Sequence, residues 1–145
     1  MFNRIAFLVC AMALSILAGC AEQGPAPTTV TLSITGAADM NGGAPAQVKV
    51  YYLNDTERFR SSDFFAVFEQ PEATLGADLV SVSPFSLAPG RTVADTKSFA
   101  TPPAAIGVVA AFRDINGAFL AVRTLVPNAP NPVQVTLNGN RVVIR

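Results

Sequence analysis

The sequence predicts an all-β domain, a β-sandwich of eight short strands with one short helix, over residues 29–145. Three observations support this prediction. Apolar and polar residues alternate in several short segments, Gly, Pro, Asn and Asp gather between those segments, and helical spacing of apolar residues occurs in one place. Short strands joined by frequent turns are typical of a sandwich, and a chain of this length can bury one core.

Two half-buried strands are expected at the start of the domain. Residues 29–35 alternate Thr or Ser with Val, Leu and Ile, and residues 47–52 alternate in the same way. The connection between them, Gly36–Pro45, contains Gly, Ala, Pro and short polar residues around one methionine. This composition indicates a loop.

A short helix is expected at about Ser62–Glu69. A Ser-Ser-Asp sequence can cap its start, the apolar residues then follow helical spacing, and Pro71 should stop it. Phe64, Val67 and Phe68 fall on one helix face. We therefore predict that Phe64 and Phe68 are buried.

The phenylalanines of this region admit two interpretations. Phe59, Phe64, Phe65 and Phe68 could form an aromatic ligand site, or they could be the apolar face of a helix that seals one end of the sandwich. Because large apolar side chains are most often buried, core packing is the expectation.

The middle of the domain should supply three strands. Leu79–Leu87 is expected to be an irregular strand at a sheet edge or bulge, because Pro84 has no N–H to donate to a neighbour. A Pro-Gly turn leads into the next strand, Arg91–Phe99. Ile106–Phe112 is apolar on both faces, which indicates a central strand covered on both sides.

Two hairpins should complete the sandwich. Asp114–Gly117 is the expected turn into a strand at Ala118–Leu125. Asn138–Asn140 is the expected turn between strands at Val133–Leu137 and Arg141–Arg145. Both turns contain Asn-Gly, the commonest sequence of tight hairpins.

Residues 1–19 have the pattern of a secretory signal peptide. Arg4 supplies a positive charge, and the apolar run at 5–18 is shorter than the roughly 20 residues that a membrane-spanning helix needs. Leu17–Cys20 reads Leu-Ala-Gly-Cys, the pattern of a lipobox, in which the cysteine thiol receives diacylglycerol.

The expected mature protein is therefore a lipoprotein. Cys20 should carry diacylglycerol and an N-acyl chain, residues 20–28 should be a lipidated N-terminus with a flexible tether, and no other cofactor is expected. In lipoproteins of enterobacterial type, an Asp directly after the lipid-bearing cysteine tends to hold the protein at the inner membrane. Residue 21 is Ala, so the expected location is the outer membrane, facing the periplasm.

The composition argues against several classes of function. The chain contains no His, and its cysteines are Cys10 in the signal peptide and the lipid-bearing Cys20. The commonest catalytic bases and nucleophiles and most zinc sites are thus missing, so an enzyme is not expected. Ten basic residues against ten acidic ones give no electrostatic basis for binding nucleic acid.

An ordered set of segments points to a family. These segments read Val-Lys-Val-Tyr-Tyr-Leu-Asn-Asp at 48–55, Ser-Asp-Phe-Phe-Ala-Val-Phe at 62–68, Leu-Gly-Ala-Asp-Leu at 75–79, Leu-Ala-Pro-Gly at 87–90 and Ala-Ile-Gly-Val-Val-Ala-Ala-Phe-Arg-Asp at 105–114. The chain resembles the TssJ lipoprotein family of type VI secretion systems, also called SciN or VasD, over about residues 30–123.

The resemblance implies a transthyretin-like β-sandwich tethered to the outer membrane. It also implies a partner, the periplasmic C-terminal part of the inner-membrane protein TssM, which joins TssL in a complex across the envelope. On this interpretation the protein catalyses no reaction. The residues by themselves leave one alternative, a periplasmic lipoprotein that binds a small ligand or glycan.

The Gly36–Pro45 loop is the expected docking surface for the TssM-like partner. It is the longest connection without a strand or helix pattern, and functional loops are commonly displayed from a rigid scaffold. Hydrogen-bonding side chains, an adaptable thioether and close approach of the backbone make five residues the candidate contacts. They are Asp39, Met40, Asn41, Gly42 and Gly43. In the resembled family the corresponding loop is implicated in TssM binding.

Overall fold

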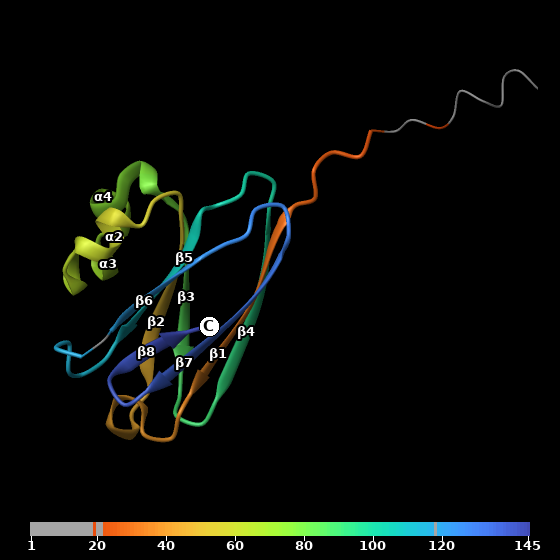
Figure 1. The fold of residues 1–145 in the computed structure, drawn as a ribbon. Coiled ribbons are helices and arrows are strands. Elements are labelled where there is room, and N and C mark those ends of the chain that lie inside the picture. The colour runs from red at the N-terminus through yellow and green to blue at the C-terminus, as the bar shows by residue number, and fades with distance from the viewer. Residues whose placement is uncertain (1–18, 20–21, 118) are drawn as a thin grey trace, which may run out of the picture.

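Two four-stranded sheets pack face to face (Figure 1). One sheet has the order β4-β1-β7-β8, formed by Thr92–Phe99, Thr28–Gly36, Pro130–Asn138 and Arg141–Ile144. The other has the order β3-β2-β5-β6, formed by Leu79–Leu87, Ala46–Leu53, Ala105–Ala111 and Leu120–Thr124. Neighbouring strands are antiparallel except for β1 and β7, which are parallel. The prediction of an eight-stranded β-sandwich is confirmed.

The computed structural model describes residues 19, 22–117 and 119–145. The expected signal peptide, apart from Gly19, and Cys20, the expected site of lipid attachment, fall outside the described residues. Within the described part of the chain, no helix is long and apolar enough to cross a membrane.

The main core lies between the two sheets. It is built by the residues that point inward at every second position of a strand. Examples are Val30, Leu32 and Ile34 of β1, each at most 1% exposed. Strand β5 is central and buried at almost every position, as its two apolar faces predicted. Pro84 lies in β3, an edge strand, also as predicted.

The helical region differs from the sequence prediction. Instead of one helix at 62–69, three short α-helices follow one another between β2 and β3: α2 (Glu57–Ser61), α3 (Phe64–Glu69) and α4 (Pro71–Leu75). Two 3₁₀ turns, η2 (Met40–Gly43) and η3 (Gly76–Asp78), are also present. Pro71 begins α4 and does not merely end α3, because a proline fits the first turn of a helix, where its missing N–H is not needed.

A second core lies under these helices. Tyr51 and Val109 point out of the β3-β2-β5-β6 sheet and pack against Phe59, Phe64 and Val67. The helices therefore cover the outer face of this sheet. The sequence analysis had instead expected a helix that seals one end of the sandwich. Core packing was correct for Phe59 and Phe64, whereas Phe68 is only partly buried.

The sandwich has two different ends (Figure 1). Residues 22–27 lead into β1 at one end, called here the tether end, where the three helices also lie. The connections 37–45, 88–91 and 139–140 and residues 112–117, which follow β5, lie together at the opposite end, called here the loop end. The predicted docking loop is thus displayed at the end away from the tether.

Candidate partner-docking site

The loop at 37–45 has a defined conformation. It contains η2, in which Asn41, Gly42 and Gly43 have φ values of 49°, 62° and 84°. Three successive left-handed residues explain the Asn-Gly-Gly sequence, because Gly adopts positive φ freely and Asn tolerates it best among the other residues. The sequence predicted a loop correctly but not this turn.

Met40 is buried, so its side chain is not displayed at the surface as the sequence analysis expected. Its side chain is 0% exposed and belongs to the main core. Gly36 leaves the space for it, since a Cβ added there would clash with Met40 Sδ. The apolar side chain closes the loop end of the core because moving it out of water is favourable in free energy.

Asn41 is also buried, at 4% exposure, and it connects three segments of the loop end. Its amide Nδ2 donates to the Pro45 carbonyl at 2.9 Å, and its Oδ1 accepts from the Arg113 N–H at 2.7 Å. Its own backbone N–H donates to the Gly139 carbonyl at 2.8 Å. The side chain of Asn41 therefore holds the loop in place and is not displayed at the surface as expected.

Replacing Asn41 by alanine is expected to lower the free energy of unfolding by about 2 to 4 kcal/mol. The backbone N–H of Arg113 would lose its acceptor, and alanine would have to adopt the left-handed backbone conformation of residue 41. Urea denaturation measures the change. Asn128→Ala is the matched control, because Asn128 is exposed and also has positive φ, at 53°. Equal losses in the two variants would show that the amide of Asn41 contributes nothing.

The remaining three candidates reach solvent. Asp39, Gly42 and Gly43 are exposed, and a Cβ added at either glycine would meet no atom within 4 Å. Neighbouring connections surround them with further exposed charges, from Arg91, Arg113, Asp114 and Arg141. The surface available to a partner at the loop end is therefore polar and rests on the buried pair Met40 and Asn41.

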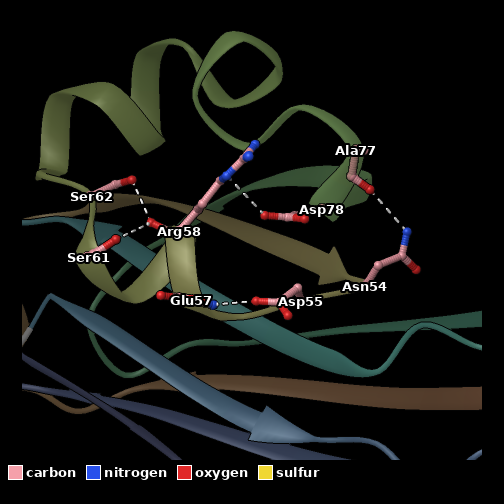
Figure 2. A network of polar contacts seen from close by, with 8 residues as sticks. All are labelled: Asn54, Asp55, Glu57, Arg58, Ser61, Ser62, Ala77 and Asp78. Carbon is pink, nitrogen blue, oxygen red and sulfur yellow. Dashed lines mark hydrogen bonds and ion pairs between the residues drawn. The ribbon is translucent and has the colours of Figure 1, made fainter.

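A polar network fixes the helical segment at the tether end (Figure 2). The Asn54 amide donates to the Ala77 carbonyl at 3.2 Å, and Arg58 Nε lies 3.6 Å from the Asp78 carboxylate. The Ser61 and Ser62 hydroxyls both donate to the Arg58 carbonyl. Since most of these groups are exposed, the network orders the helical turns more than it stabilises the domain.

Two side chains of β2 hold α3 on the sheet. Lys49 Nζ donates to the Phe68 carbonyl at 2.6 Å, and the Tyr51 hydroxyl donates to the Val67 carbonyl at 2.8 Å. Both carbonyls belong to the last turn of α3, where unpaired acceptors favour donors and positive charge. Burial, with a smaller effect from the Glu72 charge, holds the pKa of Tyr51 well above its usual value, so its hydroxyl stays a donor.

An aromatic cluster on α3 is partly open to solvent. The Phe64 ring is T-shaped to Phe65 at 5.3 Å and to Phe119 at 5.4 Å, and it stacks on Phe68 at 5.1 Å. Phe65 is 55% exposed. Sequence periodicity could have shown this, because Phe65 falls on the helix face opposite to Val67.

The described residues contain no group of three His, Cys, Asp or Glu side chains that could hold a metal ion. An open hollow of about 330 Å³ lies on the outer face of β7 and β8, lined by Gln134, Thr136, Asn138, Val143 and Arg145. Small-molecule sites are usually enclosed and lined mostly by hydrophobic and aromatic side chains, whereas this hollow is open and four of its five lining side chains are polar or charged.

Residues 28–140 match the family described as type VI secretion lipoprotein, VasD, EvfM, TssJ, VC_A0113. The chain belongs to this family. The resemblance seen in the ordered sequence segments is thereby confirmed. No curated protein sequence matches the chain significantly.

Solved structures share the family's two-sheet fold. TssJ1 from Pseudomonas aeruginosa is 26% identical with a TM-score of 0.78, over 82% of this chain and 95% of that one. Serratia marcescens Lip, a membrane-bound component of the type VI secretion system, is 19% identical with a TM-score of 0.75, over 82% and 96%. A chain of a type VI membrane complex is 24% identical with a TM-score of 0.70, over 81% and 98%. A chain in the structure described as the TssM C-terminal domain from EAEC is 23% identical with a TM-score of 0.67, over 81% and 98%.

Proposed function

We propose that this family member is an outer-membrane lipoprotein that binds the periplasmic C-terminal region of a TssM-like inner-membrane protein. The lipid on Cys20 holds the tether end at the membrane, and the loop end meets the partner. Through TssM and the TssL-like protein joined to it, the chain links the two membranes of the secretion complex. It needs no catalytic residue for this function.

The proposal rests on family membership and on the positions of the tether and the docking loop in the fold. The tether and the 37–45 loop lie at opposite ends of the sandwich (Figure 1). The seven residues 21–27 can span at most about 25 Å, and the nine residues of β1 add roughly 30 Å. The loop can therefore stand away from the membrane, where a periplasmic partner reaches it.

The loop is also pre-organised for binding. Asn41 and Met40 fix its conformation from below, so little conformational entropy is lost when a partner contacts Asp39 and the two glycines. The alternative function is binding of a small ligand or glycan, for which the open hollow on β7 and β8 is a candidate site. That hollow is open, and most of its lining side chains are polar or charged, unlike those of typical small-molecule sites.

Replacing Asp39 by lysine is expected to weaken binding of the partner's periplasmic region about tenfold, because charge reversal at an interface opposes its electrostatic complementarity. The dissociation constant of the lipoprotein in detergent with the purified periplasmic region of the TssM-like protein measures this. Asp39 is exposed and makes no contact that the fold needs, unlike Met40, where an aspartate would place a charge in the core.

Glu22→Lys is the charge-matched control, because Glu22 is exposed in the tether, at the other end of the molecule. It should bind like the parent. If Asp39→Lys also bound like the parent, the 37–45 loop would not be the docking surface.

A further inference from the structure

We propose that the docking surface extends beyond the loop end, along the side of the sandwich to the exposed face of α3, and that the partner segment received there is apolar and basic. The inference rests on the proposed function, because it takes the same partner. It assigns a second contact region, centred on Phe65 and Glu69.

The first observation is an exposed aromatic side chain on an ordered support. Phe65 is 55% exposed, yet its ring is held at 5.3 Å by Phe64, which is itself 9% exposed. Lys49 and Tyr51 fix the backbone of α3 from below. A large aromatic surface that loses little side-chain entropy on binding is typical of an interface anchor.

The second observation is the charge around this side chain. Glu69 lies one helical turn after Phe65 and is exposed, as is Asp63 at the start of α3. In the helical segment 54–78 the acids outnumber the bases, with Asp55, Glu57, Asp63, Glu69, Glu72 and Asp78 against Arg58 and Arg60. An apolar side chain flanked by carboxylates favours a partner with an apolar residue beside lysine or arginine. The same carboxylates would be repelled by an anionic membrane surface.

The third observation is that this face is continuous with the loop end. Phe64 contacts Phe119, which belongs to the connection between β5 and β6. Arg113 lies near the start of the same connection, and its backbone N–H donates to Asn41 Oδ1 in the docking loop. Figure 1 shows this connection between α3 and the 37–45 loop, on the side of the molecule that carries the helices. One partner segment that lies along this side would meet both regions.

The test measures binding of the purified periplasmic region of the TssM-like protein to the detergent-solubilised lipoprotein. Phe65→Ala should weaken binding at least about tenfold, since exposed aromatic anchors dominate interface energy. Glu69→Lys should slow association about threefold or more at low salt, and this difference should shrink at high salt, where charges are screened.

Two controls separate the surface from general effects. Val126→Ala truncates another exposed apolar residue, 59% exposed, in the connection between β6 and β7 at the tether end. Glu22→Lys reverses an exposed charge in the tether, outside the acidic helical segment. Both should bind like the parent, and circular dichroism should show that all four variants are folded.

Each other outcome overturns the inference. If Phe65→Ala and Glu69→Lys bind like the parent while Asp39→Lys is weakened, the partner contacts the loop end only and the proposed function stands. If Phe65→Ala leaves partner binding unchanged and weakens sedimentation with phosphatidylethanolamine and phosphatidylglycerol vesicles, the face contacts lipid. If the parent itself does not bind the partner, the proposed function and this inference both fail.

Discussion

Truncating Phe59 to alanine is expected to lower the free energy of unfolding by about 3 to 5 kcal/mol. Phe59 is fully buried in the second core, and its ring centroid lies 5.0 Å from that of Tyr51. Its ring fills the space above Gly107, where an added Cβ would lie 2.6 Å from the ring. Because a domain is stable by only about 5 to 15 kcal/mol, urea denaturation should show a large shift of the midpoint.

Phe65→Ala is the matched control for this prediction. It makes the same truncation in the same helical segment, but Phe65 is 55% exposed, so a change below about 1 kcal/mol is expected. A loss for Phe59→Ala as small as that for Phe65→Ala would show that the helices contribute little to the stability of the sheet.

Gly107 supplies a reciprocal measurement of the same contact. Gly107→Ala should cost about 1 to 3 kcal/mol, because the new methyl group overlaps the Phe59 ring. Combined with Phe59→Ala, the methyl group enters space that the ring has left, so the two losses should be less than additive. If the two losses of stability were strictly additive, residue 107 and the Phe59 ring would not be in contact.

Replacing Cys20 by serine is expected to abolish lipid attachment and release the protein from the membrane. The hydroxyl of serine is a much weaker nucleophile than a thiol, so diacylglycerol is not transferred to it. Each methylene that the acyl chains bury contributes about 0.8 kcal/mol, so their loss removes most of the affinity for the membrane. Incorporation of labelled fatty acid and membrane fractionation measure the effect.

Cys10→Ser is the control, because Cys10 lies in the expected signal peptide and carries no lipid in the proposed mature protein. It should leave labelling and fractionation unchanged. Retention of Cys20→Ser in the membrane, without label, would mean that something other than lipid anchors the protein.

The sequence by itself determined the strands. Side chains in a strand alternate between two faces, so a period of two in residues 29–35 and 47–52 identified β1 and β2 to within one or two residues. The doubly apolar segment after Ala105 identified a central strand, and Pro84 identified an edge. These rules are local, because they follow from the geometry of one strand and the missing N–H of one proline.

The helices were determined only in part. The period at Phe64, Val67 and Phe68 gave α3, but α2 and α4 are too short to show a period of their own. Short helices gain little from their own hydrogen bonds, so packing against the sheet stabilises them. That packing places Phe59 over Gly107, a contact between residues far apart in the chain.

The docking loop shows most clearly what only the tertiary structure decided. Composition identified residues 36–45 as a loop, and within it Met40 and Asn41 seemed as available to a partner as Asp39. The structure buries both, because the loop closes over an end of the core that an apolar side chain can fill and beside backbone groups of Arg113 and Gly139 that need partners. Those groups come from connections that are distant in sequence from this loop. No local pattern could therefore separate the residues that support the surface from those that form it.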